Sequence, residues 1–294
     1  MSAPGSEATI GAFVDLHAHS TASDGSRAPA AVIEEAKRVG LAAIALTDHD
    51  TVAGLQEAQA AGSRLGVRVV PGVELSAVEN DEETHMLGLH LAHLDELESR
   101  LVELRTMRRA RAESIVRRLD ELGVKIEFDE VLQRAAGGAI GRPHVARTLV
   151  ENGWATDFRD AFDRYLGNGK AAFVPKDRLP MVDAIAIIHD AGGIAVLAHP
   201  GASGTRARIE TLVDHGLDGV EVRHPSHSHE DVVRIQALVD HFRLVPSGGS
   251  DWHGMPEGGR ALGGMRIPLA WLERQDAFVR QRAAGGGDHR AFVA

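Results

Sequence analysis

Histidines and carboxylates gather just after short apolar runs of the sequence. The first group reads Asp15-Leu16-His17-Ala18-His19-Ser20 and is followed closely by Asp24. In an extended strand, residues two apart project from the same face, so His17 and His19 can present two imidazoles to one ion. A single pair of this kind can equally be two hydrogen-bonded histidines at a strand end, so the interpretation depends on whether the pattern recurs.

The pattern recurs in five later segments: Thr47-Asp48-His49-Asp50, Gly72-Val73-Glu74-Leu75-Ser76, Thr84-His85, Leu197-Ala198-His199-Pro200 and Gly249-Ser250-Asp251-Trp252-His253. Together the groups offer nine candidate metal ligands: His17, His19, Asp24, His49, Glu74, His85, His199, Asp251 and His253. One ion takes about four to six donors, so two or three divalent ions are predicted. Imidazole and carboxylate donors suit Zn²⁺, Mn²⁺ and Fe²⁺ alike, and the residues do not choose among these ions.

The elements expected to position these residues are short buried strands alternating with amphipathic helices, a pattern typical of an α/β fold built from βα units. The expected strands span 12–16, 41–47, 67–73, 86–91, 194–198, 219–222 and 244–246. Barrels of βα units carry their sites at the carboxyl ends of the strands, so we expect each candidate ligand at such an end. The first helix has Pro29 near its start and Gly40 just past its end.

This alternation stops between about residues 95 and 179, where the sequence becomes helical and charged. Leucines and isoleucines recur on one side of a long predicted helix over 96–123, and shorter helices are predicted over 128–136, 143–152 and 157–166. We therefore expect a barrel domain made of residues 1–94 and 180–294, interrupted by an all-helical insertion at 95–179.

Composition excludes several classes of function. The 294 residues include 32 Lys and Arg against 42 Asp and Glu, a net charge of −10, which disfavours a broad basic surface for duplex nucleic acid or anionic membrane. The chain has no cysteine, so disulfides, thiolate metal sites and cysteine nucleophiles are excluded. With no long apolar run and no signal-like start, the sequence predicts a cytoplasmic protein.

The segments DLHAHS with SDG, TDHDT, GVELS, AHP and GSDWHG resemble, in order and spacing, the motifs of the PHP (polymerase and histidinol phosphatase) family, from roughly residue 17 to residue 264. The resemblance implies a distorted (β/α)₇ barrel that holds up to three metal ions and hydrolyses phosphoesters. It also implies that the nine candidates are the ligands and that Glu74 bridges the metals.

Two segments of the insertion, Ile140-Gly141-Arg142-Pro143-His144 and Tyr165-Leu166-Gly167-Asn168-Gly169-Lys170, resemble a bacterial subgroup that acts on nucleoside 3′,5′-bisphosphates and on the 5′ ends of short RNAs. Pro143 stands where the subgroup's pattern has Thr. The resemblance implies that Arg142, His144 and Lys170 hold a second phosphate, and guanidinium and ammonium groups suit that role. The alternative is that Arg142 pairs within the insertion.

Other basic and histidine residues have more ordinary interpretations. His224 or His227 could reach the same end of the barrel, and we favour His227 as a substrate contact because its His-Ser pair resembles the subgroup's segment. Arg108 and Arg111 belong to a basic run expected to be mostly a solvated helix face, with phosphate contact as a second interpretation. His189, His215 and His241 are expected to be structural.

The predicted activity is hydrolysis of a nucleotide phosphate monoester by a metal-bound hydroxide, without a protein nucleophile. The expected substrate is a nucleoside 3′,5′-bisphosphate or the 5′ end of a short RNA, with no stable binding of duplexes and no membrane partner. Alternatives are a phosphatase for AMP, histidinol phosphate or a cyclic sugar phosphate, a C–N hydrolase of the amidohydrolase type, and a non-catalytic metal-binding module.

Overall fold

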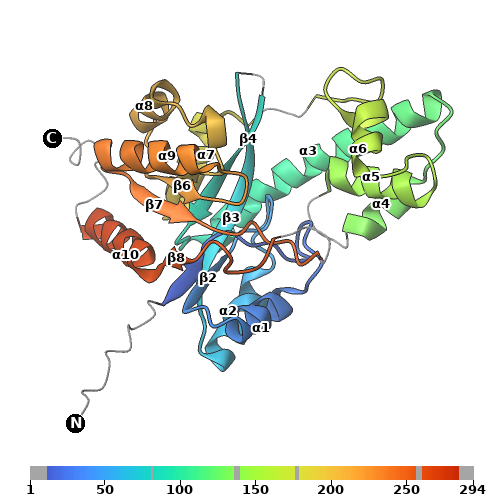
Figure 1. Cartoon of the computed structure of the whole chain (residues 1–294). Helices are drawn as coiled ribbons and strands as arrows, with labels where there is room; N and C mark the ends of the chain where they lie inside the picture. Colours follow the sequence, from blue (N-terminus) through green and yellow to red (C-terminus); the bar gives the residue numbers. More distant parts are fainter. Residues whose placement is uncertain (1–11, 81, 136–139, 176–178, 256–259, 285–294) are drawn as a thin grey trace, which may run out of the picture.

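The computed structural model describes residues 12–80, 82–135, 140–175, 179–255 and 260–284. Eight strands form one sheet that curls into a nearly closed barrel (Figure 1). The strands are β1 (Phe13–Asp15), β2 (Ala43–Leu46), β3 (Arg68–Glu79), β4 (Glu82–Leu89), β5 (Ile194–Leu197), β6 (Gly219–Arg223), β7 (Val245–Gly248) and β8 (Ile267–Pro268).

The strand order is β7-β6-β5-β4-β3-β2-β1-β8. Parallel pairs run from β1 to β3 and from β5 to β7, whereas β4 is antiparallel to both of its neighbours and β8 is antiparallel to β1. The backbone N–H of Leu16 donates to the carbonyl of Gly248 at 3.1 Å, which joins the first strand to the last parallel strand and closes the barrel.

Five of the predicted strands lie within two residues of the observed ones. The exceptions are β3, which continues to Glu79, and β4, which begins at Glu82 and runs in the opposite direction. The expectation that His85 follows the carboxyl end of a strand is therefore wrong, because His85 lies in the first half of β4. The register between β3 and β4 nevertheless pairs His85 with Ser76, two residues from Glu74.

The helices cover the outside of the barrel and form the insertion (Figure 1). Those around the barrel are α1 (Pro29–Arg38), α2 (Leu55–Leu65), α7 (Met181–Asp190), the short 3₁₀ turn η2 (Gly201–Ser203), α8 (Arg206–Asp214), α9 (His229–His241) and α10 (Leu269–Ala284). The insertion contains α3 (Leu94–Glu121), α4 (Phe128–Ala135), α5 (Arg142–Glu151), α6 (Phe158–Ala161) and the π-helical turn η1 (Phe162–Leu166). The predicted helix at 128–136 is present up to Ala135, and residue 136 lies outside the described residues.

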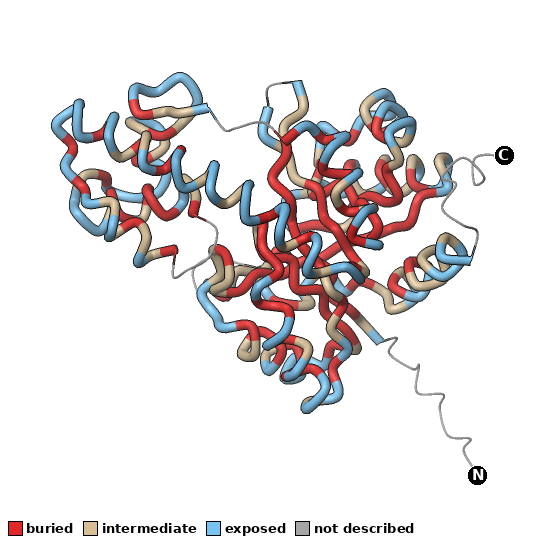
Figure 2. Tube along the Cα trace, turned by 180° about the vertical axis from the view of Figure 1, so that it is seen from behind, coloured by how far each residue is buried: buried red, intermediate tan, exposed pale blue. Residues whose placement is uncertain are grey.

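The long helix α3 joins two separate hydrophobic cores. Leu97 and Leu101 are buried with the barrel residues, whereas Ile115 and Leu119 belong to a second core that also contains Leu149 of α5. Figure 2 shows the two buried regions, one through the strands and a smaller one among the helices of the insertion. The change from one core to the other therefore falls inside α3, beyond the predicted boundary at residue 95.

Pro143, the departure from the subgroup's pattern, lies in the first turn of α5. The first N–H groups of a helix have no partner within the helix, so a proline is accommodated there without losing a hydrogen bond. Of the helices in the described part of the chain, none has the length and apolarity that crossing a membrane requires.

Candidate metal centre and substrate cleft

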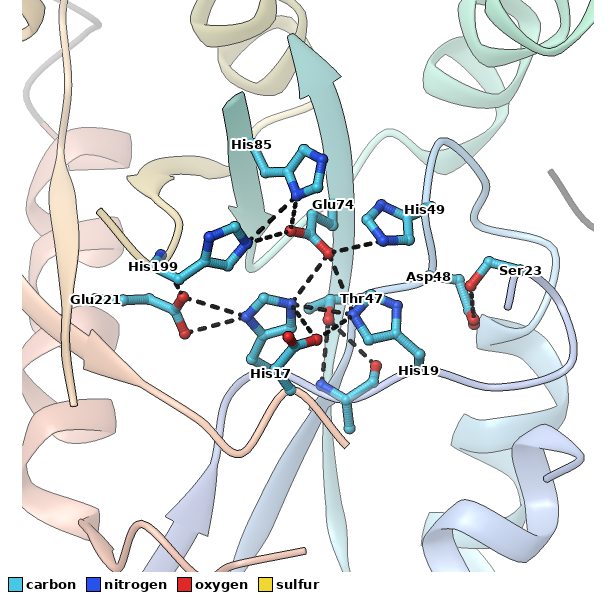
Figure 3. A network of polar contacts seen from close by, with 12 residues as sticks. His17, His19, Ser23, Thr47, Asp48, His49, Glu74, His85, His199 and Glu221 are labelled. Atoms are coloured by element: carbon cyan, nitrogen blue, oxygen red, sulfur yellow. Dashed lines mark hydrogen bonds and ion pairs between the residues drawn. The ribbon is translucent and has the colours of Figure 1, made fainter. Parts of the chain in front are cut away.

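The end of β1 brings two imidazoles together inside the barrel. His17 and His19 are fully buried, and their Nε2 atoms are 3.0 Å apart. Nε2 of His17 is also 3.1 Å from Oε2 of Glu74, a residue of β3 (Figure 3). The alternation of the extended backbone thus presents both rings to one carboxylate.

Glu74 lies at the centre of the cluster, and its two oxygens face different histidines (Figure 3). Oε1 is 2.8 Å from Nδ1 of His85 and 3.0 Å from Nε2 of His199. Oε2 is 3.2 Å from Nε2 of His19 and 3.4 Å from Nε2 of His49. If metal ions were bound, Glu74 would offer one oxygen to each of two groups of donors.

The remaining candidates, Asp24, Asp251 and His253, extend this cluster. Oδ1 of Asp251 is 3.1 Å from Nε2 of His19 and 3.4 Å from Nε2 of His17. Oδ1 of Asp24 is 3.3 Å from Nε2 of His253, and its Oδ2 is 3.8 Å from Nε2 of His49. The structure therefore brings all nine predicted ligands into one continuous network.

The donors present fit divalent metal ions. Several subsets place one donor atom per residue within 4.8 Å of one another, among them His19 with Asp24, His49 and His253, and His49 with Glu74 and His85. Nδ1 of His19 and Nδ1 of His49 are buried and, among the described residues, have no hydrogen-bond partner. Burying a nitrogen without a hydrogen-bond partner is energetically unfavourable, and coordination to a metal ion would give such a nitrogen a partner.

The electrostatics of the site keep its carboxylates ionised. Burial acts to raise the pKa of Glu74, but the neighbouring charges of His49, His17 and His85 outweigh it and hold that pKa well below its ordinary value. Burial alone would lower the pKa of His19, but its hydrogen bonds to Asp251 and Glu74 outweigh burial and raise that pKa to about 10. The carboxylates are thus stabilised as anions by positive charge at the positions where cations would bind.

Loops at the mouth of the barrel hold strained conformations. His199 and Asp251 have φ angles of 29° and 49°, in the left-handed region that residues other than glycine rarely adopt. Such strain persists where the surrounding structure enforces it, which is common at functional sites. Gly249 is required for another reason, since a Cβ there would lie 2.5 Å from the backbone nitrogen and Cβ of His17.

Sequence reasoning missed one residue of the centre, Glu221 of β6. Its side chain is fully buried, and its Oε1 accepts a hydrogen bond from Nδ1 of His17 at 3.1 Å (Figure 3). Its Oε2 accepts from the backbone N–H of His199 at 2.8 Å. A carboxylate on the outer nitrogen of a ligand histidine fixes the tautomer that points its other nitrogen at the metal.

His224 and His227 differ in where they point. His224 is buried, and its Nε2 is 3.4 Å from Oδ2 of Asp251, so it borders the candidate centre. His227, which we favoured from the sequence, accepts from the N–H of Gly201 at 3.1 Å through Nε2 and donates to the carbonyl of Val222 at 3.0 Å through Nδ1. Both of its nitrogens are bound to backbone, which is the geometry of a structural histidine.

A cleft of about 170 Å³ lies between the metal candidates and the insertion. One wall carries Asp24, His49 and His85, and the other carries Arg142 and His144. His144 is buried, and its Nδ1 accepts from the N–H of Gly141 at 3.1 Å, which fixes the ring at the start of α5. The cleft therefore combines a wall of candidate metal ligands with a wall that carries the Arg142 guanidinium.

Three arginines line this cleft: Arg108, Arg111 and Arg142. Nη2 of Arg142 donates to Glu83 of β4 at 2.9 Å, so Arg142 also pairs outside the insertion. Nε of Arg108 is 2.5 Å from the buried carboxylate of Asp50, so Arg108 lines the cleft and is not part of a solvated helix face. Lys170 is exposed in the turn after η1 and is not among the residues that the structure places around the cleft.

The fold and the site together define a class: a βα barrel whose buried imidazole and carboxylate donors fit metal ions, with a helical insertion beside them. Residues 15–169 match the PHP domain family, more than half of the chain. The chain belongs to this family, and the resemblance drawn from its motifs is confirmed.

Relatives with assigned activities are similar over most of their length. The 5′-3′ exoribonuclease Rnm of Escherichia coli is 36% identical, over 84% of this chain and 87% of its own. The 3′,5′-nucleoside bisphosphate phosphatase of Chromobacterium violaceum is 38% identical, over 86% and 91%. The phosphoribosyl 1,2-cyclic phosphate 1,2-diphosphodiesterase of Eggerthella lenta is 36% identical, over 82% and 94%.

Among solved structures, a metal-dependent phosphoesterase from Bifidobacterium adolescentis aligns with a TM-score of 0.82 and 30% identity, covering 90% of this chain and 96% of that one. The fold class inferred from the sequence is confirmed. The protein is a metal-dependent hydrolase of phosphoester bonds.

Proposed function

We propose that this protein removes a phosphate from a small nucleotide, with a nucleoside 3′,5′-bisphosphate as the first candidate substrate and the 5′ end of a short RNA as the second. The observation that carries the proposal is the cleft whose one wall holds Asp24, His49 and His85 and whose other wall holds Arg142 and His144. Two anion-binding walls facing each other suit a substrate with two phosphates.

Two or three divalent ions, with Mn²⁺ the first choice, would be held by the nine residues of the cluster, with Glu74 between them. Bound there, the ions supply an acidified water as nucleophile and a Lewis acid for the phosphoryl oxygens. The protein's own part is to hold the ligands. Glu221 fixes His17 and the backbone of His199, so the donor geometry is set before substrate arrives.

Arg142 would bind the phosphate that is not cleaved. Its guanidinium sits in the cleft at the start of α5, where the first N–H groups of the helix also favour an anion. Binding energy from this remote phosphate orients the scissile one at the metal wall. Lys170 lies farther out and would contribute charge to the approach of the substrate.

The relatives support this substrate class without narrowing it to one compound. Two of them are named for a nucleoside bisphosphate and for RNA, and a third is named for a cyclic ribosyl phosphate. A cyclic phosphodiester is therefore the second candidate class of substrate. A cytoplasmic location and the absence of duplex binding accord with the acidic, cysteine-free composition and belong to the same proposal.

A phosphate-release panel tests the proposal. The panel compares adenosine 3′,5′-bisphosphate, AMP, short 5′-phosphorylated RNA, histidinol phosphate and a cyclic ribosyl phosphate on the metal-loaded protein. We expect the highest kcat/KM for the bisphosphate. We also expect Arg142→Ala to lower kcat/KM for the bisphosphate more than for AMP, and an equal loss for both would contradict the second-phosphate role.

A further inference from the structure

We propose that Glu83 competes with the substrate for Arg142, so that a carboxylate of the barrel limits how tightly the cleft holds its second phosphate. The inference rests on the proposed function in taking Arg142 as a phosphate-binding residue. It assigns a role to a carboxylate that neither the metal cluster nor the phosphate chemistry explains.

A carboxylate inside a cleft that binds anions repels them, so its presence there calls for an explanation. Glu83 and His85 are two residues apart on β4, and both line the cleft. Thr84, between them, lies on the other side of the strand, where its hydroxyl accepts from Arg208 at 2.9 Å. The alternation of the strand therefore directs the Glu83 carboxylate toward the space in which a phosphate would bind.

Arg142 is held mainly by the insertion itself. Its Nη1 donates to the carbonyl of Leu166 at 3.3 Å and to Oδ1 of Asn168 at 3.4 Å. Its guanidinium carbon lies 5.7 Å from the ring centroids of Phe162 and of Phe173. These contacts fix the guanidinium and leave Nη2 directed at the barrel, where Oε2 of Glu83 accepts its hydrogen bond at 2.9 Å.

Arg108, which lines the cleft, and Asp50 form a second arginine–carboxylate pair, and this pair is fixed in place. Asp50, the partner of Arg108, is 2% exposed, and its Oδ1 also accepts from the N–H of Ser76 at 2.8 Å. The side chain of Glu83, in contrast, is 35% exposed. Of these two carboxylates, Glu83 is the one that reaches solvent, so the Glu83–Arg142 pair is the one that a phosphate can replace.

Glu83 also has another position to occupy when it leaves Arg142. Its Oε1 lies 3.8 Å from Nε2 of His85, whose other nitrogen, Nδ1, faces Glu74 at 2.8 Å. A small rotation of the Glu83 side chain would bring it to the outer nitrogen of this candidate ligand. A phosphate that binds Arg142 must displace Glu83. Its binding therefore gains less free energy than it would at a guanidinium without a carboxylate partner.

Glu83→Gln removes the competing charge but keeps an oxygen that can accept from Arg142. The worth of a partly exposed ion pair corresponds to an effect of about threefold to fivefold on binding. We expect the KM for adenosine 3′,5′-bisphosphate to fall by about that factor, and the KM for AMP to stay unchanged because its only phosphate is held at the metal wall. In an Arg142→Ala background the same substitution should have no effect.

Glu82→Gln is the matched control, because Glu82 is the exposed neighbour on the same strand; it should change neither KM. An unchanged or higher KM for the bisphosphate in Glu83→Gln, or an equal fall for both nucleotides, would overturn the proposal.

A calorimetric measurement separates this proposal from the proposed function. If the wild-type protein hydrolyses neither nucleotide, the proposed function fails, but binding of adenosine 3′,5′-bisphosphate to the metal-loaded proteins can still be compared. Tighter binding to Glu83→Gln than to the wild type supports the competition, and equal or weaker binding refutes it.

Discussion

Glu221 provides a sharp test of how the protein prepares its metal centre. Replacing it with alanine removes the acceptor of the Nδ1–H of His17, at 3.1 Å, and of the backbone N–H of His199, at 2.8 Å. The His17 ring can then place its proton on Nε2, the nitrogen that faces Glu74. Loss of such an outer partner typically lowers metal affinity by about 10- to 100-fold, or about 1.4–2.7 kcal/mol.

The assay is calorimetric titration of the metal-free protein with Mn²⁺, in the wild type and in Glu221→Ala and Glu221→Gln. Glutamine keeps one oxygen for the two donors, so its loss of affinity should be the smaller. Asp218→Ala is the matched control, because Asp218 is a buried carboxylate whose Oδ2 accepts from a histidine, His189, and from the backbone N–H of Ala195, each at 2.8 Å.

Asp218→Ala should lower the melting temperature and leave Mn²⁺ affinity unchanged, since His189 is not among the candidate ligands. The reasoning is refuted if Glu221→Ala binds Mn²⁺ as the wild type does, or if Asp218→Ala loses as much affinity.

Three further substitutions test separate parts of the structure. Gly249→Ala places a Cβ 2.5 Å from His17, so it should cost about 1–3 kcal/mol of stability and lower the metal content; wild-type values for both would contradict the close approach. Leu149→Ala, in the second core, should cost about 2–5 kcal/mol by denaturant unfolding and leave Mn²⁺ affinity unchanged. His227→Ala should lower the melting temperature without changing the KM for nucleotides, whereas a raised KM would restore it as a substrate contact.

The proximity of the nine candidate donors could be predicted because most of them lie in short motifs next to an apolar strand. Parallel strands bring their carboxyl ends to one side of the barrel, so the sequence alone indicates that His17, His49 and His199 lie near one another. The direction of β4 could not be predicted, because the apolar pattern of residues 86–91 reads the same along either direction of a strand. His85 reaches the centre from the first half of β4 and not from the end of a strand.

The sequence around Glu221 does carry a signal for its role. It lies between Val220 and Val222 in a strand that is buried along most of its length. In such a strand a carboxylate faces the interior and requires a partner, and the histidines at the other strand ends were the available ones. Spacing alone does not tell whether His224 or His227 faces the candidate site, because both follow the same strand.

The boundary of the insertion illustrates a different limit. Leu97, Leu101, Ile115 and Leu119 lie on one side of α3, and helical periodicity does not tell which core each of them contacts. The division of the chain into residues 1–94 and 180–294 and an insertion at 95–179 therefore stays a prediction. Limited proteolysis with mass spectrometry would locate the boundary.

The central claim is that nine residues from separate strands and loops of the barrel form one multinuclear metal centre. Metal content per chain, measured by mass spectrometry on protein purified without chelators, tests it most directly. The account predicts two or three divalent ions per chain, with a lower number in His49→Ala. One ion or none in the wild-type protein would contradict it.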